Sequence, residues 1–153
     1  VKDKKCKLVP VLCGSFHRYI EENRDPKDDK DVACFVEAMK KAAAKRRTLV
    51  VAAADLAHVG PVFGDLYPVD VLERAKLLKS DNELMAAIAV GDADGMFTQV
   101  KQEKDRRRIC GLSSIYLALR ILGQTKGEVT GYAQCPADQQ EASFVSICGM
   151  VFR

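Results

Sequence analysis

The segment Thr48–Gly60, TLVVAAADLAHVG, constrains the fold most, because it joins an apolar run to two reactive side chains. Residues 49–51 are apolar and follow a charged run, a pattern that predicts a buried strand. Asp55 and His58 come next, at the point where the chain would leave a sheet. Ligands and catalysts in open α/β sheets lie outside the carboxyl ends of the strands. The segment therefore predicts an α/β fold with Asp55 and His58 in a site at the sheet edge.

The rest of the chain predicts a mixed sheet of about four strands, flanked by helices. The strands are expected at 7–13, 48–54, 128–134 and 143–152. The first two would form a parallel βαβ unit around a helix at 26–46, and the last two an antiparallel pair. Periodic apolar residues predict further helices from Pro68 to Leu78, from Ser80 or Asp81 to Ala89, from Asp92 to Lys104 and from Leu112 to Leu122.

Composition narrows the class of protein. The 153 residues suit one domain of ordinary size, predicted over 1–153 because nothing resembles a linker. The net charge of +3 comes from 24 basic and 21 acidic residues mixed along the chain, which argues against a nucleic-acid partner. No apolar run approaches the roughly 18 residues of a membrane span. Six cysteines without regular spacing predict free thiols, and hence a cytoplasmic protein.

Cys110 differs from the other cysteines because it follows three arginines and opens an apolar helix. A neighbouring cation and the positive end of a helix both favour the thiolate form. Such a thiolate could bind a metal or act as a nucleophile. A small buried residue is the alternative, since cysteine is often found in cores.

The other candidates also have structural alternatives. His58 could serve only as a hydrogen-bonding residue, and Asp55 could cap a turn. His17 has no partner nearby in sequence and is expected on the surface. The arginines 106–108 are expected to be a solvated loop rather than an anion clamp.

Three motifs, taken in order, resemble the Memo family, whose prokaryotic members are called AmmeMemoRadiSam system protein B. The motifs are Asp55-Leu56-Ala57-His58 after an apolar strand, Arg108-Ile109-Cys110-Gly111 at the start of a helix, and Gly131-Tyr132-Ala133 near the last strand. The resemblance runs from about Lys7 to the end of the chain. It covers only the C-terminal half of a Memo protein, so this chain is expected to be a fragment.

The resemblance implies a fold similar to the class III extradiol dioxygenases, which use non-haem iron. In Memo proteins, two histidines of the N-terminal half and one cysteine bind iron or copper. Cys110 would be that cysteine, His58 the acid–base histidine and Asp55 the acid beside it. Two departures stand out: Ala53-Ala54 replaces a serine pair, and neither metal-binding histidine has a counterpart here.

These points predict the C-terminal part of a metal-dependent redox or dioxygenase-like protein. The intact protein would use Fe(II) or Cu, and this chain alone would bind none. Its partners would be the missing N-terminal half and, from the family name, a radical S-adenosylmethionine protein. One alternative is a phosphopeptide-binding or scaffold module without catalysis, in which arginines 106–108 attract a phosphate. A Cys–His hydrolase is a further variant.

Overall fold

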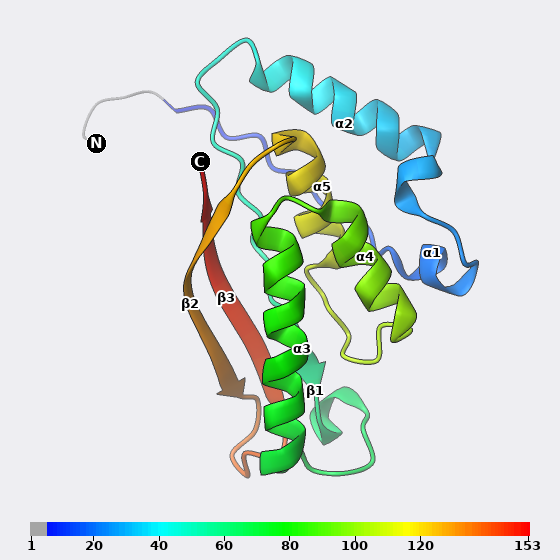
Figure 1. The fold of residues 1–153 in the computed structure, drawn as a ribbon, viewed down its shortest axis with the longest axis vertical. Coiled ribbons are helices and arrows are strands. Elements are labelled where there is room, and N and C mark those ends of the chain that lie inside the picture. The colour runs from blue at the N-terminus through cyan, green and yellow to red at the C-terminus, as the bar shows by residue number, and fades with distance from the viewer. Residues whose placement is uncertain (1–5) are drawn as a thin grey trace.

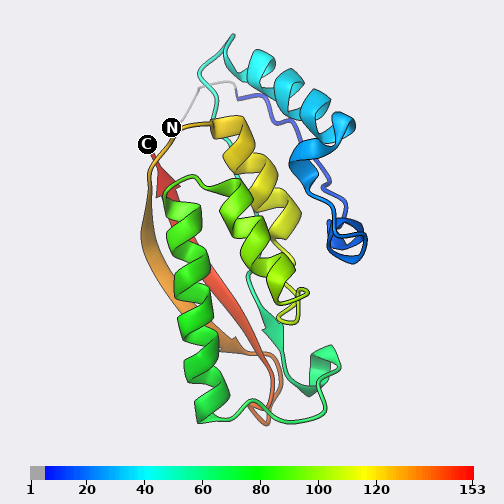
Figure 2. The same cartoon turned by 45° about the vertical axis from the view of Figure 1, so that its right-hand side comes forward.

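The computed structural model describes residues 6–153, so the first five residues of the predicted domain lie outside it. Helices lie on one side of a three-stranded antiparallel sheet of order β1-β3-β2 (Figures 1 and 2). The helices are α1 His17–Glu21, α2 Lys30–Ala43, α3 Val71–Ala89, α4 Ala93–Gln102 and α5 Leu112–Leu122, with short 3-10 turns at η1 Pro26–Asp28 and η2 Pro61–Phe63. The strands are β1 His58–Val59, β2 Gly127–Pro136 and β3 Phe144–Phe152. In the part of the chain that is described, no helix is both long and apolar enough to cross a membrane.

The two C-terminal strands were correctly predicted as an antiparallel pair. β2 and β3 pair over almost their whole length, with Tyr132 opposite Cys148. On β3, Phe144 and Ser146 face the helices and are buried, whereas Ile147 and Val151 face away and are partly exposed. This alternation is the period of two that a strand imposes on its side chains. Together, the helices and this sheet confirm the predicted α/β class.

The predicted strands at 7–13 and 48–54 were wrong, and so was the βαβ unit built from them. Both segments are irregular, although α2 does lie between them. A strand needs a neighbour to satisfy its N–H and C=O groups, and neither segment has one among residues 6–153. Their apolar side chains face solvent, with Leu12 100% and Leu49 85% exposed. Pairing with β3 begins only at Leu56, whose N–H donates to the Ser146 carbonyl at 2.9 Å.

The helices largely follow the predictions, with two corrections. α2 begins at Lys30 rather than at Pro26, because the Asp29 side chain accepts from the N–H groups two and three residues later. α3 is one continuous helix, without the predicted break at Ser80 or Asp81. Asp81 does not cap a helix, since its carboxylate points inward to two partners on other elements. The predicted helices at 92–104 and 112–122 correspond to α4 and α5.

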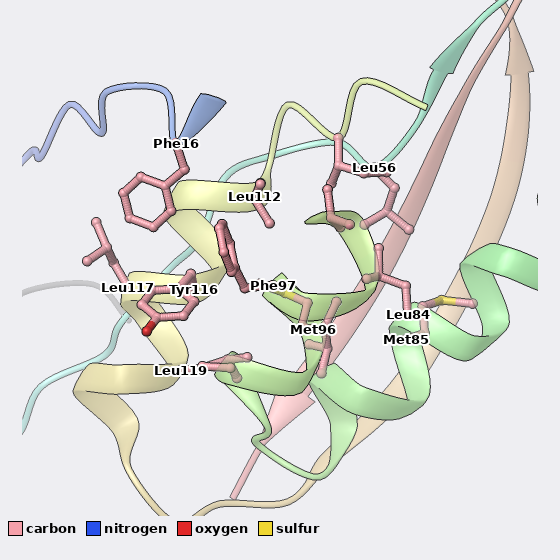
Figure 3. Packing of buried hydrophobic residues seen from close by; sticks show 14 of the residues in the cluster. Phe16, Leu56, Leu84, Met85, Met96, Phe97, Leu112, Tyr116, Leu117 and Leu119 are labelled. Carbon is pink, nitrogen blue, oxygen red and sulfur yellow. The ribbon is translucent and has the colours of Figure 1, made fainter. Parts of the chain in front are cut away.

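Aromatic side chains pack α5 against its neighbours in the hydrophobic core (Figure 3). Tyr116 packs edge-on against Phe16 and Phe97, with ring centroids 5.5 and 6.1 Å away. Leu84 of α3 and Met96 of α4 complete this core and are 0% and 1% exposed. This packing fixes α5, and Cys110 lies two residues before its first residue, Leu112.

A buried ion pair ties the segment before Cys110 to α3 and β2. The Arg107 guanidinium binds the Asp81 carboxylate, which is fully buried, and also Glu103 at 2.8 Å. The Tyr132 hydroxyl donates to the second Asp81 oxygen at 2.8 Å. A carboxylate can be held away from water only when such donors replace its hydration.

Removing the Asp81 carboxylate should therefore cost much of the stability. We expect Asp81→Ala to lower the free energy of unfolding by about 3–5 kcal/mol, because the buried Arg107 guanidinium would keep only Glu103 and the Tyr132 hydroxyl would lose its acceptor. Urea denaturation followed by circular dichroism measures the change. Glu83→Ala removes an exposed carboxylate from the same helix and should change stability by no more than about 0.5 kcal/mol. Equal effects of the two substitutions would contradict the structural role of Asp81.

Candidate functional site

The structure brings together the three side chains that the sequence singled out. Asp55, His58 and Cys110 each offer one ligand atom, and these atoms all lie within 4.8 Å of one another. Asp55 and His58 belong to the segment that enters β1, whereas Cys110 comes from the turn before α5, more than 50 residues later. No other group of three or more His, Cys, Asp or Glu side chains with this geometry occurs among residues 6–153.

Backbone hydrogen bonds join the two segments that carry these side chains. The N–H of Cys110 donates to the Leu56 carbonyl at 3.3 Å, and the N–H of Gly111 donates to the Asp55 carbonyl at 3.0 Å. A Cβ on Gly111 would lie 2.5 Å from that same carbonyl oxygen. Only glycine allows the backbones to approach so closely, which explains why glycine follows Cys110.

Hydrogen bonding assigns the proton of the neutral His58 ring. Nδ1 lies 3.3 Å from the Leu56 carbonyl oxygen, which can only accept, so Nδ1 carries the hydrogen. Nε2 is then left with its lone pair, 3.9 Å from a carboxylate oxygen of Asp55. Metal-binding and acid–base histidines commonly have one nitrogen donating to a carbonyl in this way. The His58 side chain is 20% exposed and that of Asp55 51%, so both can be reached from solvent.

The expectation that the surroundings favour the Cys110 thiolate was wrong. Partial burial, and the negative charges of Asp55 and Asp105, raise the pKa of Cys110 above the ordinary value for a thiol. Arg108, the expected source of positive charge, instead binds Asp65 and the His58 carbonyl. Cys110 is exposed rather than a core residue. Without a metal or a bound cation, this cysteine is therefore a poor nucleophile.

The three arginines before Cys110 do not form an open anion clamp. Arg107 is buried on Asp81 and Glu103, and Arg108 binds Asp65. Only Arg106 is largely exposed, at 81%, and its guanidinium lies 3.8 Å from Glu73. The expectation of a solvated loop thus holds for Arg106 but not for Arg107. A phosphate would have to displace existing ion pairs, so the geometry does not favour the phosphopeptide alternative.

The remaining histidine and cysteines do not belong to the converging group of Asp55, His58 and Cys110. His17 is exposed as expected and pairs with Glu21 one turn later, at 3.2 Å. All six cysteines are free thiols, as their irregular spacing predicted.

Sequence reasoning missed Asp65 as part of the site, and it assigned the charge of Arg108 to Cys110 rather than to Asp65. The Asp65 and Arg108 side chains form a two-point ion pair, with a shortest distance of 2.7 Å, that links the His58 segment to the Cys110 segment. Asp65 is the only acidic or basic residue between His58 and Asp70, within a turn rich in glycine and proline. That isolation was the one available signal, because the partner lies 43 residues away.

The donor set fits part of a transition-metal site. Thiolate, imidazole and carboxylate together suit iron or copper better than magnesium or calcium. A catalytic metal commonly has three protein ligands and an open position. If His58 and Asp55 handle protons instead, Cys110 is the one remaining ligand here. The residues present therefore fit a metal ion, but they do not by themselves make a complete site.

Comparison with known proteins agrees with these observations. No curated protein matches the chain. The model of the Memo family, described as Memo-like protein, matches residues 3–151, which is nearly the whole sequence. The matched region contains the converging Asp55, His58 and Cys110. On this evidence, the chain belongs to the Memo family.

Proposed function

We propose that this chain supplies part of the active site of a metal-dependent redox or dioxygenase-like protein that uses Fe(II) or Cu. The convergence of Asp55, His58 and Cys110, with ligand atoms within 4.8 Å, carries the proposal. In this site Cys110 would bind the metal through Sγ. A bound metal of this type supplies Lewis-acid and one-electron chemistry.

His58 is suited to move a proton. Its Nδ1–H donates to Leu56, so Nε2 is free to accept a proton from a substrate in the site. The imidazolium formed would be stabilised by the Asp55 carboxylate, 3.9 Å from Nε2. Because Asp55 is half-exposed and rigidly joined through its carbonyl to Gly111, it can serve this role without a large rearrangement. We therefore assign His58 as the acid–base residue and Asp55 as its partner.

The remaining ligands would come from a second segment that corresponds to the N-terminal half of a Memo protein. An uncovered apolar surface supports this partner. Leu8 and Leu12 are at least 87% exposed, and Val51 is 72% exposed. The face of the sheet away from the helices also exposes two apolar side chains of β3, Ile147 and Val151. Large exposed apolar patches usually mark an interface.

Partner and compartment follow from the same proposal. Pairing of residues 7–13 and 48–54 with strands of the second segment would satisfy their backbone groups and bury these side chains. The family resemblance also supports a radical S-adenosylmethionine protein as a further partner. Six free thiols support a reducing compartment, which we propose to be the cytoplasm.

We expect weak metal binding by this chain alone. After loading with Fe(II) or Cu and dialysis, it should retain well under one metal ion per chain, because two ligands are missing. Titration with Co(II) should nevertheless produce a thiolate-to-cobalt absorption band that Cys110→Ser abolishes and Cys34→Ser, on α2, leaves unchanged. Stoichiometric retention after dialysis would refute the missing-ligand proposal, and a band that survives Cys110→Ser would refute Cys110 as the ligand.

The alkylation of Cys110 should depend on pH in a defined direction. Since the thiolate is the reactive form, the raised pKa of Cys110 predicts half-maximal reaction with iodoacetamide above the ordinary thiol value of about 8.5. Asp55→Asn removes a negative charge that disfavours the thiolate, so the midpoint should fall. Peptide mass spectrometry can follow Cys110 separately, and Asp28→Asn, an exposed site elsewhere, is the control. A midpoint well below that of an ordinary thiol would instead favour a nucleophilic Cys–His enzyme.

A further inference from the structure

The turn that leads to Cys110 has an unfavourable backbone. Lys104, Asp105 and Arg108 all have positive φ, at 54°, 49° and 52°. Residues with a Cβ rarely adopt this left-handed conformation, and it persists where the surrounding contacts require it. One such contact is internal, because the Asp105 carboxylate accepts the N–H of Ile109 at 2.8 Å. The others reach across to the His58 segment.

Arg108 makes the main contact across the site. Its two terminal nitrogens bind both carboxylate oxygens of Asp65, at 2.7 and 3.3 Å. Nη1, the nitrogen that lies 3.3 Å from Asp65, also donates to the backbone carbonyl of His58 at 3.2 Å. Asp65 in turn accepts the N–H of Gly60 at 2.7 Å, which closes the turn after His58. Arg108 hydrogen bonding, together with the Gly60 N–H, holds the pKa of Asp65 below its usual range, so the pair is ionised at neutral pH.

His58 is thereby held on both sides of its backbone by the turn before Cys110. Its N–H donates to the Arg107 carbonyl at 2.7 Å, and its carbonyl accepts from Arg108. Its ring packs edge-on against Phe63, with ring centroids 5.0 Å apart, and Phe63 lies inside the turn that Asp65 closes. The position of the imidazole relative to Cys110 therefore depends on contacts made by Arg107 and Arg108.

We propose that Arg108 and Asp65 are a positioning pair that sets the His58 imidazole against the Cys110 thiol. Neither side chain belongs to the group of candidate ligands, so each acts through the backbone that it holds. Arginine is suited to this position because its planar group serves three acceptors at once, whereas lysine offers a single flexible ammonium. The purpose of the pair rests on the proposed function, but its geometry can be tested without a metal.

The first test measures the position of the His58 ring by NMR. His17→Gln leaves His58 as the one histidine, so its ring protons can be assigned directly. In this background we expect Arg108→Gln to move the His58 ring-proton shifts toward random-coil values, because the Phe63 ring would no longer hold its place. Arg106→Gln makes the same change of charge two residues earlier, on an 81% exposed side chain, and should leave the shifts unchanged.

The second test measures the assembled site with Co(II) as the probe. Arg108→Gln should weaken Co(II) binding at least tenfold and reduce the thiolate-to-cobalt band. Arg108→Lys should restore part of the affinity, and Arg106→Gln should match the unmodified protein. Asp65→Asn, which keeps the size of the side chain, is the second variant and should resemble Arg108→Gln. Thermal unfolding of every variant identifies any that does not fold. If either Arg108→Gln or Asp65→Asn fails to fold, the result from the other variant tests the proposal.

The outcomes separate this proposal from the proposed function. Unchanged His58 shifts in both folded variants, Arg108→Gln and Asp65→Asn, would overturn the positioning pair, whatever the metal result. Shifts that move as expected would support it even if the unmodified protein gave no cobalt band, a result that would instead count against the metal-dependent function. A loss of affinity as large in Arg106→Gln as in Arg108→Gln would show a general charge effect and would also overturn the proposal.

Discussion

The short backbone junction between the segment entering β1 and the turn before α5 is the interaction on which the candidate site depends. The carbonyls of Asp55 and Leu56 accept the N–H groups of Gly111 and Cys110, and the N–H of His58 donates to Arg107. These three hydrogen bonds join parts of the chain that are about 50 residues apart. They hold the ligand atoms of an imidazole, a carboxylate and a thiol within 4.8 Å of one another, although no two of these side chains share a helix or strand.

Two ion pairs support this junction, one buried in the core and one near solvent. On the inner side, Arg107 is anchored on buried Asp81, and Tyr132 of β2 shares that carboxylate. On the outer side, Arg108 binds Asp65 near solvent. Two adjacent arginines thus point in opposite directions, one into the core and one toward the site. Arg108 itself has a left-handed backbone conformation, with φ of 52°.

Two apolar segments without strand partners account for the main error of prediction. Residues 7–13 and 48–54 have the apolar character of buried strands, yet they have no neighbours to pair with among the described residues. Periodicity reports which side chains would be stable in a core. It does not report whether the pairing strands are present.

The sequence by itself determined the elements whose stability is local. α4, α5 and the β2–β3 pair follow from apolar periodicity and from capping residues close in the chain, and the family motifs indicated Asp55, His58 and Cys110. Only the tertiary structure decided the rest: that Asp81 is a buried anchor rather than a helix cap, that Arg108 serves Asp65 instead of Cys110, and that the Cys110 pKa is raised. The physical reason is that charges act on whatever lies nearest in space. For each of these groups, that neighbour comes from a distant part of the chain.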